Sequence, residues 1–145
     1  MRGEGFTLVE LIVVLAILAG LAALVAPSFS RTVESARLRT AASDVRSTFA
    51  RARALAVASA RERSAVFDLS QGGFGVDNEA ARLLPESIRL EAVLPGGDRR
   101  DRGNVRVRFF PDGGGEAAEI SVTAKDGGTL RVTVDPLTGL SEAGL

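Results

Sequence analysis

Residues 5–26 of this chain read GFTLVELIVVLAILAGLAALVA, and this stretch decides how the rest of the fold is organised. From Phe6 to Ala26, only Thr7, Glu10 and Gly20 interrupt the apolar side chains. At 1.5 Å rise per residue, a helix over this run would be about 32 Å long, which is close to the thickness of a bilayer core. We therefore expect the chain to begin with a helix that can span a membrane.

Glu10 is the charged residue inside this run. A carboxylate at the bilayer centre costs about 2.5–3.5 kcal/mol on insertion scales, so an acid there usually faces a partner. A secretory signal peptide would have an uncharged apolar region and then a cleavage site, but Glu10 interrupts the region and an amphipathic sequence continues past Ala26. A plain membrane anchor explains the length of the run but not the spacing of Gly5, Phe6 and Glu10. The N-terminal assembly helix of a filament subunit is the third interpretation.

The hexapeptide Gly5-Phe6-Thr7-Leu8-Val9-Glu10 resembles the processing site of type IV prepilins and of the pseudopilins of type II secretion. The resemblance implies that prepilin peptidase cuts between Gly5 and Phe6 and that Phe6 is then N-methylated. It also implies that Glu10 pairs in the filament with the N-terminal amine of a neighbouring subunit. Breaking a buried ion pair costs about 3–5 kcal/mol, so this pair would specify the registry between subunits.

The same resemblance predicts how the chain is divided and where it resides. Residues 1–5 would be a leader peptide, residues 6–27 a transmembrane or filament-core helix, and residues 28–145 a globular domain. We expect a single-pass protein of the bacterial inner membrane, with the globular domain extracytoplasmic and the assembled form in a filament.

Composition bounds the rest of the chain. A length of 145 residues predicts one domain, and 18 basic against 18 acidic residues give no sign of a nucleic-acid partner. The charges are unevenly distributed, because residues 31–63 hold eight arginines and three acids, whereas residues 64–145 hold nine basic and thirteen acidic residues. A basic helix and an acidic sheet could attract each other, although we favour a solvated helix face as the explanation.

The helix is expected to continue beyond its apolar half, to about Arg61, with a kink or local break at Pro27. Three- and four-residue steps define one apolar face, and Arg39, Arg46 and Arg53 repeat every seven residues on another. The residues expected on the apolar face are Leu38, Ala41, Ala42, Val45, Phe49, Ala52, Leu55, Ala56 and Ser59.

After Arg63 the apolar period changes to two, which predicts strands. We expect strands at 64–69, 73–76, 88–94, 105–110, 119–123 and 130–134, a turn at 83–87, and a loop at 95–103. The fold class is therefore α+β, a long helix packed on one antiparallel sheet of about six strands. The predicted core is Phe49, Leu55, Val66, Phe67, Val107, Phe109, Ile120, Val122, Leu130 and Val132.

The second half of the chain refines the resemblance. The turn at 109–113, the strand at 120–123 and the ending at 132–139 are similar to H-type minor pseudopilins of type II secretion and to the related T-type minor pilins. This implies a minor pseudopilin, a structural subunit of the pseudopilus involved in protein secretion. Its implied partners are other pilin-like subunits of the filament, prepilin peptidase and the membrane. The alternative is a minor type IV pilin involved in pilus assembly or DNA uptake.

An enzyme is not expected. The chain has no histidine, cysteine, tyrosine or tryptophan, so the common catalytic bases, thiol nucleophiles and zinc ligands are missing from its composition. We predict no cofactor and no catalytic residue. The acids Asp98, Asp101, Asp112 and Glu116 lack the alternate spacing of a calcium loop, so we predict no metal site either.

DNA binding is the rival hypothesis, because a cluster of arginines could contact phosphates. The candidate phosphate contacts are Arg99, Arg100, Arg102, Arg106 and Arg108. Against this hypothesis stand the neighbouring Asp98 and Asp101, the acidic second half and the scarcity of aromatic residues for base stacking. We therefore rank DNA binding below assembly.

Overall fold

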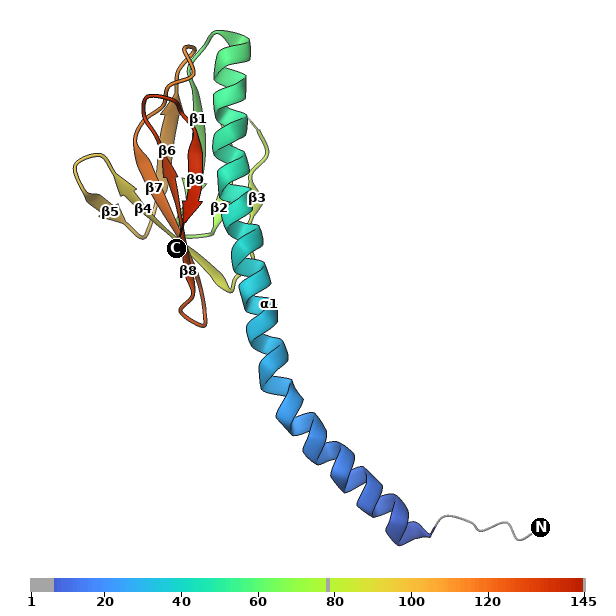
Figure 1. The fold of residues 1–145 in the computed structure, drawn as a ribbon. Helices are drawn as coiled ribbons and strands as arrows, with labels where there is room; N and C mark the ends of the chain where they lie inside the picture. Colours follow the sequence, from blue (N-terminus) through green and yellow to red (C-terminus); the bar gives the residue numbers. More distant parts are fainter. Residues whose placement is uncertain (1–6, 78, 145) are drawn as a thin grey trace. The chain divides into compact units, whose positions relative to one another are not determined.

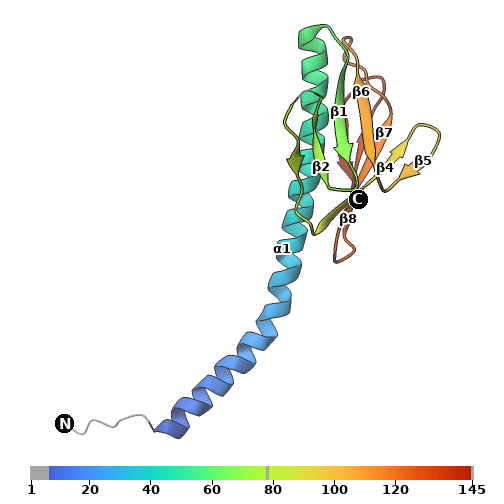
Figure 2. The same cartoon turned by 180° about the vertical axis from the view of Figure 1, so that it is seen from behind.

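The computed structural model describes residues 7–77 and 79–144, and for residues 23–31 it describes the backbone alone (Figures 1 and 2). The chain divides into two compact units, Met1–Val33 and Glu34–Leu145. One helix precedes the strands, which confirms the predicted α+β class. The elements are α1 (Leu8–Ser59), β1 (Arg63–Asp68), β2 (Gly73–Val76), β3 (Arg82–Leu83), β4 (Ile88–Leu94), β5 (Asp98–Arg100), β6 (Asn104–Phe109), β7 (Ala118–Ala124), β8 (Thr129–Val134) and β9 (Ser141–Gly144).

The backbone of α1 stays helical through Pro27, so the local break expected there is not observed. A proline removes one backbone donor, and the remaining hydrogen bonds of a 52-residue helix outweigh that loss.

The end of α1 is a Schellman motif built on an alanine. Ala60 has φ +49°, its N–H donates to the carbonyl of Val57, and the N–H of Arg61 donates to the carbonyl of Ala56. These are the two bonds that satisfy the last carbonyls of a helix. Glycine normally occupies the left-handed position, because a Cβ atom there is crowded by the backbone.

The strands form two antiparallel sheets, which corrects the prediction of one sheet. Sheet A has the order β3-β2-β1-β6, and sheet B has the order β5-β4-β7-β8-β9. The division arises because β6 returns to β1, with Ala65 opposite Val107, while β7 pairs with β4, with Leu90 opposite Val122. Both pairings join strands that are distant in the sequence, and local periodicity carries no information about such pairs.

Three short strands were not predicted. β5 lies inside the predicted loop at 95–103, β3 overlaps the predicted turn at 83–87, and β9 lies beyond the last predicted strand, 130–134. Each is a sheet edge of two to four residues and none is buried. Short polar edge strands discourage pairing with other chains, and their composition resembles that of loops.

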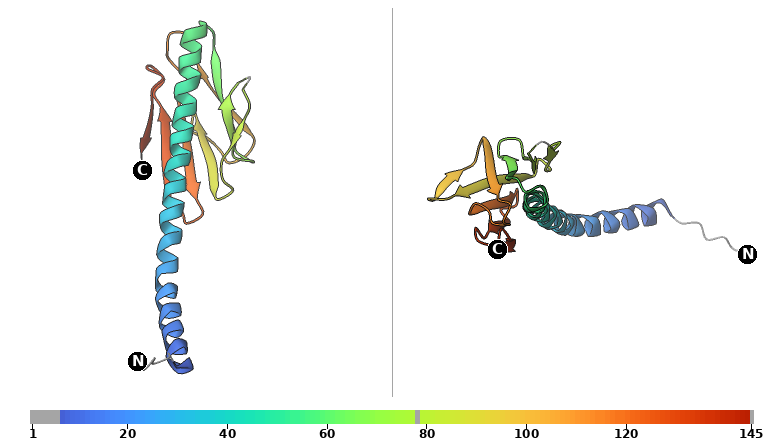
Figure 3. Two further views of the ribbon diagram at one scale, coloured as in Figure 1. Left: turned by 90° about the vertical axis from the view of Figure 1, so that its right-hand side faces the viewer. Right: turned by 90° about the horizontal axis from the view of Figure 1, so that it is seen from above.

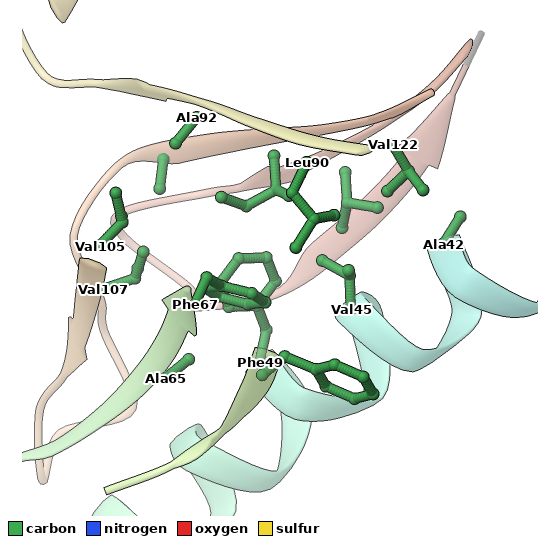
Figure 4. Close-up of a cluster of buried hydrophobic side chains, with 14 of the residues drawn as sticks. Ala42, Val45, Phe49, Ala65, Phe67, Leu90, Ala92, Val105, Val107 and Val122 are labelled. Atoms are coloured by element: carbon green, nitrogen blue, oxygen red, sulfur yellow. The ribbon is translucent and has the colours of Figure 1, made fainter. Parts of the chain in front are cut away.

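The second half of α1 and the two sheets share one core (Figure 4). Phe49 of α1 packs edge-on against Phe67 of β1 at 5.2 Å between ring centroids, and lies 6.0 Å from the ring of Phe109 in β6. Most of the predicted core is confirmed, with Leu55 and Leu130 packed at its margin. The predicted apolar face of α1 is buried from Leu38 to Ala56 except at the partly buried Leu55, while Ser59 is exposed.

Val66 is a wrong core prediction. Its neighbours Ala65 and Phe67 are both fully buried, whereas Val66 is only half-buried. Successive side chains of a strand point to opposite faces, so Val66 cannot face inward together with Phe67. It lies on the outer face of sheet A.

Candidate assembly site

Gly5 and Phe6, the predicted processing site, lie outside the described residues. Glu10 is described, and it lies exposed in the first turn of α1. Its N–H donates to the side-chain oxygen Oγ1 of Thr7 at 3.2 Å, and the N–H of Leu11 donates to the carbonyl of Thr7 at 3.1 Å. Thr7 is therefore the N-cap of α1 and Glu10 is the third helical residue.

This placement gives Glu10 a local role in addition to the predicted pairing with a neighbouring subunit. A threonine followed three residues later by glutamate, before an apolar run, is the signature of a capping box. The carboxylate also lies at the positive end of the helix dipole, which favours a negative charge. Within residues 7–77 and 79–144, no cation forms an ion pair with Glu10.

The side chains of α1 from Leu8 to Ala22 are all exposed. Leu8 is 75% exposed and even Val14, the least exposed large apolar side chain of this segment, is 42% exposed. A helix that is apolar around its whole circumference is stable only when lipid or other helices cover it. In the described part of the chain, no helix is both long and apolar enough to cross a membrane.

The arginine cluster does not form one free basic surface. Arg100 pairs with Asp98 at 2.9 Å, and Arg102 lies 3.9 Å from Asp101. Arg108 donates from Nε to Glu116 at 2.8 Å and from its backbone N–H to the same carboxylate at 3.1 Å. In the described chain, Arg99 and Arg106 have no carboxylate partner, and they lie in different sheets.

The ion pair explains the electrostatics of Glu116. The hydrogen bond from the Arg108 side chain holds the pKa of the Glu116 carboxyl below its ordinary value of 4.5, although partial burial opposes this shift. Glu62 adds a second carboxylate at 3.7 Å from Arg108. Three of the five candidate phosphate contacts are thus already paired with acids, which weakens the case for a phosphate site.

Arg53 is a residue whose role the sequence did not reveal. Its Nε donates to the carbonyl of Gly113 at 2.9 Å and to that of Thr138 at 2.8 Å. The side chain therefore joins α1 to two turns, 110–115 and 135–139. The same two turns bond to each other, since the N–H of Gly115 donates to the carbonyl of Pro136 at 3.1 Å.

Two glycines are required where these turns meet. A Cβ atom on Gly139, which has φ +62°, would lie 2.2 Å from the carbonyl oxygen of Gly113. A Cβ atom on Gly115 would lie 2.9 Å from the ring of Phe109. Both approaches are closer than any side chain allows, so the positions of the two turns depend on glycine.

Asp135 stabilises the second of these turns. Its Oδ1 accepts the backbone N–H groups of Leu137 and Thr138, both at 2.9 Å, and the hydroxyl of Thr138 at 3.2 Å. The bond from the Thr138 N–H is the largest cause that holds the pKa of Asp135 below its ordinary value of 3.8. A carboxylate that accepts several N–H bonds favours its charged form.

The sequence model of the family described as Type II transport protein GspH matches residues 41–138. This match spans more than half of the chain. The chain belongs to this family. The resemblance to H-type minor pseudopilins of type II secretion is therefore confirmed, and with it the predicted place of the chain in type II secretion.

Two further findings agree with the GspH family. A model described as the prokaryotic N-terminal methylation motif matches residues 1–26. The fold is similar to the crystal structure of the minor pseudopilin EPSH from the type II secretion system of Vibrio cholerae, with a TM-score of 0.62 and 15% sequence identity over 77% of this chain and 94% of that chain. At this identity the likeness concerns the fold. No curated protein sequence matches the chain.

Arg53, the turn at 110–115 and residues 135–138 of the second turn lie within the residues that match the GspH family. The turn at 109–113 and the ending at 132–139 are two of the three segments on which the resemblance to H-type minor pseudopilins rests. In the structure, both segments accept a bond from Arg53 and the bond from Gly115 to Pro136 links their turns, so these bonds hold the C-terminal part of the chain against α1.

Proposed function

We propose that this GspH-family chain is a minor structural subunit of the type II secretion pseudopilus and performs no catalysis. It is held in the bacterial inner membrane by its N-terminal helix, with the globular domain outside the cytoplasm, until it enters the filament with other pilin-like subunits. Prepilin peptidase prepares it by cutting between Gly5 and Phe6, and Phe6 is then methylated.

One observation carries the proposal: an exposed carboxylate, Glu10, lies in the first turn of a helix whose apolar side chains are also exposed over residues 8–22. The apolar side chains require a covering of lipid or of other helices. A carboxylate inside either covering is costly unless a cation meets it. The amine of a processed neighbouring subunit would supply that cation and neutralise both charges.

The test separates this intermolecular role of Glu10 from its local role in the capping box. Glu10→Ala removes the charge and the box, whereas Glu10→Gln removes only the charge, because glutamine also serves in a capping box. Each variant is expressed beside its companion subunits, and the protein is measured in membranes and in sheared filaments. We expect both variants to reach the membrane normally and to enter filaments poorly.

The two alternatives give different results. If Glu10 acts only as a helix cap, Glu10→Gln enters filaments like the wild type and Glu10→Ala does not. If the chain is an anchored monomer, removal of a carboxylate from its apolar helix leaves its insertion into the membrane and its activity unchanged, or improves them. Either result contradicts the proposed pairing.

A further inference from the structure

One side of strand β4 is only partly paired. On its other side β7 pairs with residues 88–93, whereas on this side β5 pairs only with residues 92–94. The hairpin of β4 and β5 projects away from the other strands (Figures 1 and 3), and after Arg100 the chain leaves β4 to begin β6 at Asn104. Residues 88–91 therefore have no strand beside them, and we call this part the open edge of β4.

The backbone of Leu90 points to the open edge. The N–H of Lys125 donates to the carbonyl of Ser87 at 3.1 Å. Because bonding alternates along an antiparallel pair, the odd-numbered residues of β4 bond to β7 and the even-numbered ones point the other way. No group of the described chain bonds to the N–H or the C=O of Leu90 on that side. Leu90 is only 2% exposed, and buried backbone groups nearly always have a partner, so water or another chain must supply one.

The open edge is the floor of a groove. Two hollows of about 370 and 360 Å³ lie along it, and both are lined by Leu69, Ser70, Arg89 and Leu90. The turn between β1 and β2, residues 69–72, forms the wall that faces β4. A groove with a wall on each side admits one extended segment of chain, whereas the edge of a second sheet would collide with the turn.

Two unpaired charges of opposite sign flank Leu90. Arg89 and Glu91 are exposed and line the groove, and among the described residues neither forms an ion pair. The other two charges at this end, Asp101 and Arg102, lie 3.9 Å from each other. Opposite charges that face each other across an antiparallel pair stabilise it. A strand that pairs with Leu90 is therefore favoured when it carries a base opposite Glu91 and an acid opposite Arg89.

We infer that an extended segment of a companion pilin-like subunit adds to the open edge of β4 as an antiparallel strand, with a basic and an acidic residue two positions apart. Main-chain bonds give such a contact its affinity, and the side chains give it specificity. A second copy of this chain is excluded, because its own Arg89-Leu90-Glu91 lies at the floor of the same groove and the two walls would collide. The inference rests on the proposed function, which brings other pilin-like subunits beside this chain.

Photochemical cross-linking in membranes tests the contact. The photoreactive amino acid p-benzoylphenylalanine replaces Gln71, an exposed residue that lines the groove, in the full chain expressed with its companion subunits. We expect an adduct with a companion subunit, which mass spectrometry maps to a segment with a base and an acid two positions apart. The matched control carries the same amino acid at Glu142, an exposed residue of β9 in another part of the fold, and should not capture that segment.

Charge reversal tests the side-chain contacts. Arg89→Glu should lower the adduct yield about three- to tenfold, because an attractive cross-strand pair becomes a repulsive one. Arg99→Glu makes the same change on the exposed β5, outside the groove, and should leave the yield unchanged. Replacing the mapped acid of the companion subunit by arginine should restore the yield of Arg89→Glu.

Hydrogen exchange tests the backbone bonds. With the companion subunit bound, the fragment that spans residues 88–92 should gain protection at about one amide, that of Leu90, since its neighbours already bond to β7 or β5. Protection that does not change on binding would mean that water alone fills the open edge, and it would overturn the inference.

Three other outcomes also overturn it. They are equal adduct yields from the two labelled positions, adducts formed only with a second copy or with a secreted protein, and equal losses from Arg89→Glu and Arg99→Glu. In each of these cases the proposed function stands as long as the wild-type chain co-purifies with its companion subunits. A wild-type chain that fails to co-purify with them contradicts the proposed function itself, and the inference with it.

Discussion

The Nε atom of Arg53 lies 2.8 Å from the carbonyl oxygen of Thr138, so a helix residue holds a turn 85 positions further along the chain. The same Nε reaches the carbonyl of Gly113, and one guanidinium group therefore connects three segments of the fold. Deleting it leaves two backbone carbonyls without their donor.

Arg53→Met is therefore expected to destabilise the unit formed by residues 34–145 by about 1.5–3 kcal/mol, the usual value of hydrogen bonds to a charged group. Urea unfolding followed by far-ultraviolet circular dichroism measures the change. Arg46→Met is the matched control, because Arg46 lies one heptad away on the same helix and its side chain has no described partner. It should change the free energy of unfolding by less than about 0.5 kcal/mol. Equal effects of both substitutions would contradict the role assigned to Arg53.

Ala60→Gly should stabilise the same unit by about 1 kcal/mol. Ala60 has φ +49°, a left-handed conformation that costs an L-residue about 1–2 kcal/mol and costs glycine little. Part of the gain is lost because glycine is more flexible in the unfolded chain. Ala58→Gly, two residues earlier in the regular helix, should instead destabilise by a similar amount. If Ala60→Gly also destabilises, the Schellman geometry is wrong.

Acid should weaken the turn that carries Leu137. The pKa of Asp135 is lower in the folded chain than its ordinary value of 3.8, so its contribution to stability is complete above that value and is lost as the pH falls through the folded-state pKa. At neutral pH the wild type should be more stable than Asp135→Asn, and the difference should narrow below about pH 3.8. Unfolding curves at a series of pH values test this. A difference that stays constant or widens in acid would contradict it.

The same sign applies to Glu116, whose pKa is held below 4.5 by Arg108. At neutral pH the wild type should therefore be more stable than Glu116→Gln, and this difference in stability should begin to narrow as the pH falls below about 4.5.

Processing of the N-terminus is the prediction that lies outside the described residues. Mass spectrometry of the membrane-derived protein should find a chain that begins at N-methylated Phe6. Gly5→Val should leave the leader attached, because the peptidase must accommodate the residue before the cut. A wild-type chain that retains residues 1–5 would contradict both the cleavage and the proposed pairing of Glu10.

The sequence determined the elements whose signal is local. The apolar run after Phe6, the three- and four-residue spacing from Leu38 to Ala56 and the alternation in β6 each follow from the periodicity of one element, and the structure has them where they were predicted. The motif around Gly5 and Glu10 likewise pointed to the type IV pilin-like superfamily, because the identities and spacing of its residues are specific. Thr7 could also have been recognised as the helix cap from its spacing to Glu10.

Tertiary structure alone decided which distant strands pair. It also decided the roles of individual residues, such as Val66 and Arg53, that no local period reveals. Two sheets form because β1 pairs with β6 and β4 with β7, and no local period distinguishes this from a single meander. Val66 has an apolar side chain that is typical of a core residue. Because its neighbour Phe67 faces inward, the side chain of Val66 lies on the outer face of sheet A. Arg53 looks like any other arginine of a solvated helix face, and its role exists only because two glycine turns bring backbone carbonyls to it across the fold.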